Sequence, residues 1–147
     1  KPEIVADLRA KYDAWFDDVS TTRPDNWSPP SIVIGSPQAP VVTLTRQDWR
    51  KVTGGGWSPN SQGNWAIDVV DSGEYQMRIR FLKNRKIKSA DVRCGNYVKS
   101  TSVSPDAQEV SIKDLNLPKG KHLLQIDLES AKGVIGPYQV EIRKHQK

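Results

Sequence analysis

Three tryptophans in polar, loop-like stretches are the residues best suited to hold a ligand: Trp27, Trp49 and Trp57. Three side-chain amides follow the last of them: Asn60, Gln62 and Asn64. Sugar rings bind exposed indole faces through C–H contacts and bind nearby amides through hydrogen bonds. We therefore expect these six residues to form a carbohydrate-binding site. The alternative is that the loop tryptophans are buried and plug the open ends of a β-sandwich.

Groups that could carry out catalysis are few in this sequence. His145 belongs to the charged C-terminal end, and His122 follows Gly120 at the start of an expected strand. Cys94 alternates with Ala90 and Val92, which is the pattern of a small buried side chain rather than a nucleophile. The serine-hydrolase and zinc-protease motifs G-x-S-x-G and H-E-x-x-H are absent. We expect no catalytic residue in this chain.

Two aspartates are the best candidates for a cation site. Asp68 lies on the polar face of an expected strand, and Asp71 lies in the turn after it. Oxygen-rich loops of β-sandwiches can bind Ca²⁺, although the sequence has no D-x-D-x-D loop. Cys94 is the only cysteine, which excludes an internal disulfide and a thiolate metal cluster. We expect no cofactor other than a structural Ca²⁺.

The charge balance favours anionic partners. The formal net charge is +5, and the one dense cluster of positive charge is formed by Lys83, Arg85, Lys86 and Lys88. Such a cluster either meets an acidic ligand or is a solvated tip or edge protected by its charge. No nucleic-acid-binding motif is present, and no apolar run reaches the ~18 residues of a membrane span. We expect neither nucleic acid nor membrane as a partner.

The clearest structural pattern covers residues 65–81. Trp65, Ile67 and Val69 share one face before the turn at residues 71–73, and a second alternating set follows it: Tyr75, Met77, Ile79 and Phe81. Period two on both sides of a Gly-containing turn predicts a β-hairpin with one buried and one polar face.

The rest of the chain divides into one helix and many strands. Apolar residues recur every three or four positions over residues 3–19, which predicts an amphipathic helix. A Pro-rich stretch, residues 20–31, then predicts an extended linker. Seven or eight short strands with turn signals follow, which indicates an all-β fold, an antiparallel β-sandwich. We expect residues 1–31 to form a helix and linker, and residues 32–147 to form the sandwich domain.

Two segments resemble a known family. Residues 5–49 contain L-R-x-x-Y-D-x-W-F followed by I-V-I-G-S, and are similar to the C-terminal end of bacterial arylsulfatase-type enzymes. Residues 56–143 contain W-x(7)-W-x-I-D-V-x-x-x-G-x-Y and L-P-x-G-K-H-x-L. This second segment resembles the galactose-binding-like jelly-roll modules that are appended to such sulfatases and to glycan-degrading enzymes.

The resemblance implies a non-catalytic C-terminal domain of a sulfatase. The family's C-x-[PS]-x-R motif, whose cysteine becomes formylglycine, is absent, because Gly-Asn-Tyr-Val follows Cys94. The implied partners are the catalytic domain of the same chain and a glycan, which the positive charge would favour in sulfated form. The implied location is the periplasm or the cell exterior. The alternative role is a structural appendage that stabilises the catalytic domain without binding sugar.

Overall fold

The computed structural model describes residues 1–22, 28–56, 58–83 and 85–145. In these residues the chain forms one α-helix, one 3-10 helix and eleven strands, and it divides into two compact units, residues 1–30 and 31–147. The elements are α1 (Pro2–Ser20), β1 (Ile32–Ile34), β2 (Val41–Thr45), η1 (Arg46–Asp48), β3 (Arg50–Thr53), β4 (Gln62–Val69), β5 (Gly73–Arg80), β6 (Ile87–Cys94), β7 (Tyr97–Ser102), β8 (Glu109–Leu117), β9 (Gly120–Ser130), β10 (Gly133–Ile135) and β11 (Gln139–Lys144). Within the described ranges, no helix has the length and apolar character needed to cross a membrane.

The first unit is the predicted amphipathic helix. Pro2 opens α1 in the first turn, where its missing N–H leaves no hydrogen bond unmade. Thr21 ends the helix, since both its N–H and its hydroxyl donate to the Asp17 carbonyl oxygen. The helix buries none of its residues, and its exposed apolar side chains recur at helical spacing: Ile4, Leu8, Tyr12, Trp15 and Val19.

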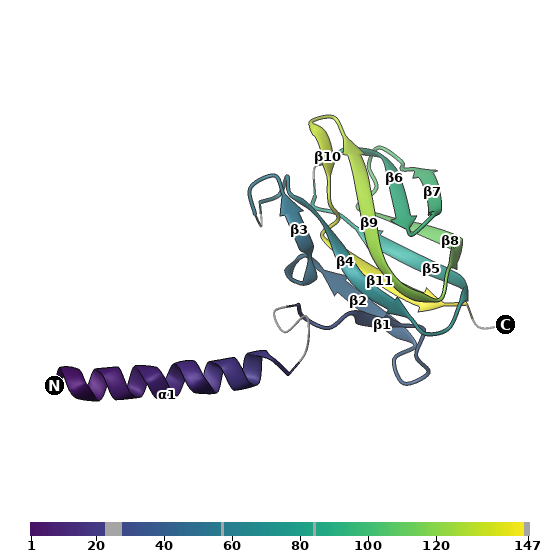
Figure 1. The fold of residues 1–147 in the computed structure, drawn as a ribbon. Coiled ribbons are helices and arrows are strands. Elements are labelled where there is room, and N and C mark those ends of the chain that lie inside the picture. Colours follow the sequence, from purple (N-terminus) through teal and green to yellow (C-terminus); the bar gives the residue numbers. More distant parts are fainter. Residues whose placement is uncertain (23–27, 57, 84, 146–147) are drawn as a thin grey trace. The chain divides into compact units, whose positions relative to one another are not determined.

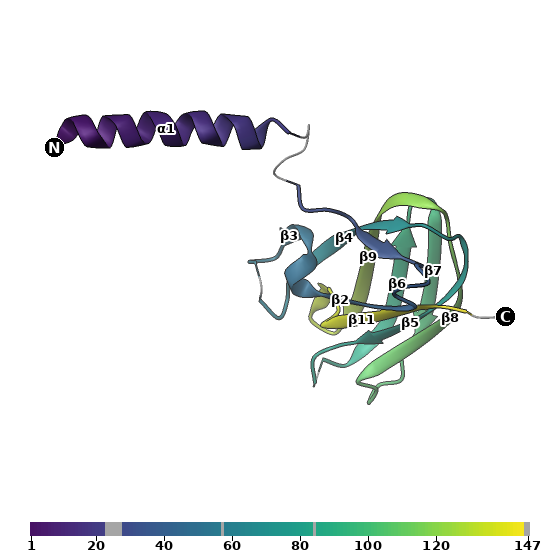
Figure 2. The same cartoon turned by 90° about the horizontal axis from the view of Figure 1, so that it is seen from below.

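The second unit is the predicted all-β sandwich, with two sheets that lie face to face (Figures 1 and 2). The larger sheet has the strand order β1-β4-β9-β6-β7, with β3 paired to β4 and β10 paired to β9. The smaller sheet has the order β2-β11-β5-β8. The described strand pairs are antiparallel except for β1 with β4, which run parallel. The sequence did not indicate that parallel pair.

The predicted hairpin over residues 65–81 is wrong in one respect. Both of its strands form where expected, but β4 belongs to the seven-stranded sheet and β5 to the four-stranded sheet. The turn at Asp71 therefore carries the chain from one layer of the sandwich to the other. Alternation shows only that each strand has one buried face. Two strands that face each other across a core give the same alternation as two that pair side by side.

The core lies between the inner faces of the two sheets. The larger sheet contributes the alternating residues of β4, β6 and β9, and the smaller sheet contributes those of β5, β8 and β11. The largest fully buried side chains are Trp65, Tyr75, Ile34, Leu44, Ile67, Met77, Ile79, Ile87, Leu115, Leu117, Leu124 and Ile126. The Trp65 indole N–H donates to the Thr45 carbonyl oxygen at 2.7 Å, so a buried side chain of β4 also links the two sheets.

Trp49 is packed between two glycines that leave no room for a side chain. A Cβ on Gly136 would lie 2.5 Å from Cζ2 of Trp49, and a Cβ on Gly63 would lie 2.6 Å from its Cδ2. We expect Gly136→Ala to lower the free energy of unfolding by about 1–3 kcal/mol, measured by urea denaturation, because the added methyl overpacks the indole.

A double-mutant cycle tests that cause. Trp49→Phe removes the far edge of the ring, so Gly136→Ala should be less destabilising in that background. Equal losses of stability in the two backgrounds would contradict the proposed clash.

Candidate functional site

Four loop segments meet at one end of the sandwich, and their described residues are 45–48, 54–56 with 58–61, 81–83 with 85–86, and 136–139. We call this end the rim. Hydrogen bonds join the segments, since Gly136 N donates to the Ser61 carbonyl oxygen at 2.9 Å and the Arg85 guanidinium donates to Asn60 Oδ1 at 2.8 Å. The rim is therefore an ordered end of the sandwich in its described part, where loops from both sheets hold one another.

Arg46 is the residue that joins these loops. Its guanidinium donates to three carbonyl oxygens, those of Ser58 at 2.8 Å, Gly136 at 2.9 Å and Pro137 at 3.0 Å. It also lies 5.0 Å from the centroid of the Trp49 ring, within the range of a cation–π contact. Burial, and next the nearby charge of Arg85, lower the pKa of Arg46, while Tyr138 acts in the opposite direction. With its donors bonded to the backbone, Arg46 positions the rim rather than contacting a ligand.

The loop at residues 54–61 contains the three consecutive glycines that predicted a loop or bulge. Gly54, Gly55 and Gly56 have φ values of 82°, 88° and 71°, a left-handed region that favours glycine. Nothing lies within 4 Å of a Cβ placed on Gly55 or Gly56, so backbone conformation rather than close approach requires glycine at these two positions. The Ser58 hydroxyl then closes the loop by donating to the Gly54 carbonyl oxygen at 3.0 Å.

Tyr138 is an exposed aromatic residue at the rim that the sequence analysis did not single out. Its exposed fraction is 54%, and it borders two hollows. One hollow, of about 720 Å³, is lined by Thr45, Arg46, Gln47 and Gln139, and the other, of about 290 Å³, is lined by Arg80, Phe81, Leu82, Lys83, Gln108 and Glu109. An accessible ring with hydrogen-bonding groups on both sides is suited to a sugar. The signal in the sequence was its place directly after Gly136-Pro137.

The structure overturns the expectation that Trp49 offers a face to a ligand. Its exposed fraction is 5%, and its ring contacts the ring of Trp65 with centroids 5.9 Å apart. The polar residues around Trp49 suggested a loop, but η1 and β3 flank it and turn its side chain into the core. Trp49 therefore supports the rim from below. Trp27 and Trp57 lie outside the described residues.

The three predicted amides lie on two different surfaces. Asn60 is exposed at the rim, where its Oδ1 accepts a hydrogen bond from Arg85 at 2.8 Å. Gln62 and Asn64 belong to β4 and lie on the outer face of the seven-stranded sheet. Gln62 donates to the Val134 carbonyl oxygen at 2.7 Å, whereas Asn64 Oδ1 is buried and has no hydrogen-bond partner among the described residues. Asn60 is thus the predicted amide that the structure places at the rim.

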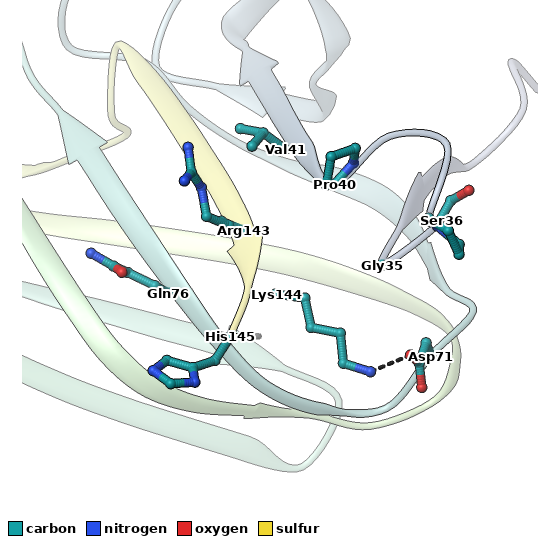
Figure 3. A pocket seen from close by; sticks show the side chains of 10 residues that line it. Gly35, Ser36, Pro40, Val41, Asp71, Gln76, Arg143, Lys144 and His145 are labelled. Carbon is teal, nitrogen blue, oxygen red and sulfur yellow. Dashed lines mark hydrogen bonds and ion pairs between the residues drawn. The ribbon is translucent and has the colours of Figure 1, made fainter. Parts of the chain in front are cut away.

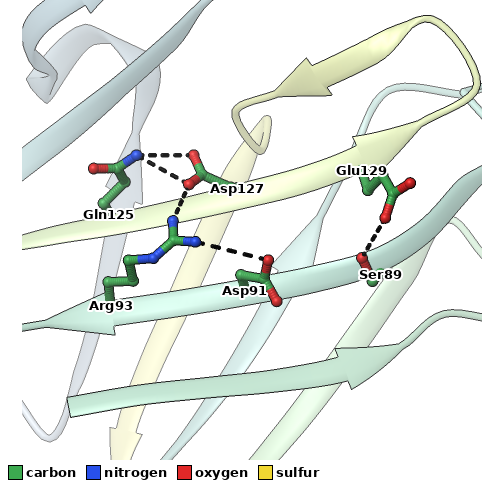
Figure 4. A network of polar contacts seen from close by, with 6 residues as sticks. All are labelled: Ser89, Asp91, Arg93, Gln125, Asp127 and Glu129. Carbon is green, nitrogen blue, oxygen red and sulfur yellow. Dashed lines mark hydrogen bonds and ion pairs between the residues drawn. The ribbon is translucent and has the colours of Figure 1, made fainter.

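The outer face of the seven-stranded sheet also carries a polar network (Figure 4). Gln125, which is paired with Asn64 in the strand register, donates to both carboxylate oxygens of Asp127 at 3.0 Å. The guanidinium of Arg93 pairs with Asp127 and lies 3.9 Å from Asp91. These contacts join β6 to β9. The polar groups of Arg93, Gln125 and Asp127 therefore bind one another on this face.

The structure adds little support for a metal site at Asp68 and Asp71 or for a reactive thiol at Cys94. Asp71 forms an ion pair with Lys144, and Asp68 lies opposite Lys121 in the strand register. Among the residues described, no three His, Cys, Asp or Glu side chains are grouped as a metal site, so the Ca²⁺ site stays a prediction based on two aspartates. Burial raises the pKa of Cys94 to about 11, which keeps the thiol protonated at neutral pH.

Comparisons with known proteins identify the fold. No protein-family model matches the chain, and no curated protein matches it. The C-terminal CBM6, a carbohydrate-binding module, of LamC, a marine laminarinase from Zobellia galactanivorans, is similar with a TM-score of 0.50 at 15% identity, covering 71% of this chain and 99% of that one. The sandwich therefore has the jelly-roll fold.

Two larger enzymes are also similar over the sandwich. A GH26-CBM35 β-(1,4)-mannanase from Podospora anserina has a TM-score of 0.48 at 16% identity, and a ruminal GH26 endo-β-1,4-mannanase has a TM-score of 0.49 at 11% identity. The alignments cover 73% and 72% of this chain, but only 28% and 26% of the respective enzymes.

Arg46 should contribute more to the stability of the protein than an exposed arginine does. We expect Arg46→Ala to lower the free energy of unfolding by about 1–3 kcal/mol, because three carbonyl oxygens lose their donor. Arg46→Lys should not restore the lost stability, since the lysine ammonium lacks the planar, forked geometry of the guanidinium group. Amide hydrogen exchange at Ser61 and Gly136 should accelerate in both variants.

Arg78→Ala is the matched control, because Arg78 is half-buried like Arg46 but has one carboxylate contact, with Glu109 at 3.9 Å. Its loss should stay within about 0.5 kcal/mol. Equal effects of Arg46→Ala and Arg78→Ala on stability and exchange would show that Arg46 does not hold the rim.

Proposed function

We propose that residues 31–147 form an accessory carbohydrate-binding module and that its ligand binds at the rim beside Tyr138. A jelly roll by itself does not define a function, so the proposal depends on the site. The observation that carries it is the Tyr138 ring, exposed between two hollows that are lined by amide, hydroxyl and charged groups. The similar CBM6 of the laminarinase supports the proposal only by showing that this fold can carry such a module.

The chemistry of the rim fits a sugar better than a catalytic reaction. Tyr138 provides an apolar face for C–H contacts, while Gln47, Gln139 and Asn60 provide amide donors and acceptors for hydroxyl groups. Arg46 and Arg85 keep this end of the sandwich positive, which adds affinity for a ligand that carries sulfate or carboxylate groups. The module binds its ligand and leaves covalent chemistry to another domain.

We also propose that this other domain is a sulfatase. The support is the resemblance of residues 5–49 and 56–143 to the C-terminal region of arylsulfatase-type enzymes. The catalytic domain of the same chain would then be the partner of this module, the substrates would be sulfated glycans, and the protein would act in the periplasm or outside the cell.

Substitution of Tyr138 tests the binding proposal. Tyr138→Ala should weaken retention in affinity gels that contain the recognised polysaccharide by about tenfold, or ~1.4 kcal/mol, because the ring loses its stacking contact. The gels would contain neutral glucans, mannans or sulfated galactans, and each would be compared with a gel that contains no polysaccharide.

Tyr12→Ala is the matched control, since Tyr12 is 58% exposed but lies on α1. Its retention should equal that of the unmodified chain. Absence of retention in every gel would refute the binding function, and unchanged retention of Tyr138→Ala would refute the assignment to Tyr138.

A second function, that of a structural appendage, is favoured by α1. The exposed side chains of Ile4, Leu8, Tyr12, Trp15 and Val19 form a stripe, and a helix with such a stripe gains stability by packing it against another surface. In this second proposal the surface belongs to the catalytic domain of the sulfatase.

Polar substitutions on the two faces of α1 test whether its apolar stripe packs against the catalytic domain. In the full-length protein, Trp15→Ser should lower the melting temperature of the catalytic domain by a few degrees, roughly the effect of 1–2 kcal/mol. Lys11→Ser, on the polar face, should leave it unchanged. If both variants melt like the unmodified protein, the stripe does not dock there.

A further inference from the structure

Another pocket, of about 560 Å³, lies at the end of the sandwich opposite the rim. It forms where β11 ends, between the loop that begins at Gly35 and the β4–β5 turn at Asp71 (Figure 3). The strand β11 starts next to Tyr138 at the rim and reaches this pocket with Arg143 and Lys144. No function of the rim requires this pocket.

Three polar side chains line the pocket without a partner among the residues that the structure describes. Arg143 and Gln76 lie opposite each other on β11 and β5, and His145 follows Arg143 on the same face. Figure 3 shows these side chains apart from the ion pair beside them. Among the described residues, none of the three side chains makes a hydrogen bond or an ion pair. Arg78 and Arg80, on the same outer face, both pair with Glu109.

The charges that line the pocket leave an excess of one cation. Asp71 is its only carboxylate among the described lining residues, and the Lys144 ammonium pairs with it. The lining therefore offers no carboxylate to pair with the exposed guanidinium of Arg143. Glu141 and Glu74 lie near on the same sheet, but neither lines the pocket.

We propose that this pocket binds an oxyanion, a sulfate or carboxylate group. The planar fork of Arg143 donates two parallel hydrogen bonds to such a group, which is the geometry that favours arginine at oxyanion sites. The amide of Gln76 and an imidazole N–H of His145 provide further donors from the same face. The proposal goes beyond the rim function and holds whether or not the rim binds sugar.

The first test compares two arginines of the same sheet. Binding of inorganic sulfate, dextran sulfate and uncharged dextran to the whole chain would be followed by NMR, through the Gln76 side-chain amide and the backbone amides of residues 143–145. We expect saturable shifts there with the anions and none with dextran. Arg143→Gln should weaken anion binding by about tenfold, whereas Arg78→Gln, with the same change of charge, should change it less than twofold.

The second test predicts a gain of affinity. Asp71→Asn removes the one carboxylate of the pocket and frees Lys144, so the affinity for sulfate should rise about threefold or more. Unfolding cannot produce that result. If free sulfate saturates the site, the pocket takes small anions, and if only dextran sulfate does, it recognises the anion on a polymer; either result supports the proposal.

Three outcomes would overturn it: no shift with either anion, equal losses in Arg143→Gln and Arg78→Gln, or no gain in Asp71→Asn. Tyr138→Ala separates the two sites. Sulfate binding at Arg143 should persist in this variant even where glycan retention is lost, and a loss of both would place the anion at the rim instead.

Discussion

The packing of Trp49 is the constraint on which the rim depends. Its indole fills the space between Gly63 and Gly136 and contacts Trp65, which is itself bonded to the Thr45 carbonyl oxygen of the facing sheet. The Arg46 guanidinium lies over the face of the Trp49 ring and donates to the carbonyl oxygens of two loops. The rim is thus built upward from the core: two buried indoles set the position of one guanidinium, and that guanidinium sets the loops around Tyr138.

The pattern of buried and exposed residues determines how much of the fold could be predicted from the sequence. Period-two alternation identified β4 and β5, because a strand with one buried face repeats every two residues in any sandwich. It could not place β4 and β5 in different sheets, since partners across the core and partners side by side leave the same pattern. One irregularity did carry information. The apolar phase shifts between Ile112 and Leu115, where a bulge with Asp114 at a φ of 54° turns both residues into the core.

The candidate site was harder to predict because its residues come from distant parts of the chain. Tyr138 and Arg46 are ninety-two positions apart in the chain, and Arg46 donates to the carbonyl oxygens of residues 136 and 137, directly before Tyr138. Arg143 and Gln76 meet through strand register, which a single sequence does not specify. Residue type also misled the prediction at Trp49, since a tryptophan among polar neighbours reads as a loop residue whether its ring faces inward or outward. Asn60 is exposed, as expected for a residue of a polar loop, and its role in binding stays a prediction.

The binding and structural roles do not compete for the same residues. A glycan would contact Tyr138 and the amides of the rim, which belong to the second unit, whereas the apolar stripe belongs to α1 in the first unit. The two ends of β11, an inner strand of the four-stranded sheet, also differ in chemistry, because β11 begins beside the Tyr138 ring and ends at the Arg143 guanidinium. A jelly roll permits this division, since its core fixes the strands while each end and each face remains free to carry its own side chains. Each surface can therefore lose its role without affecting the fold that supports the others.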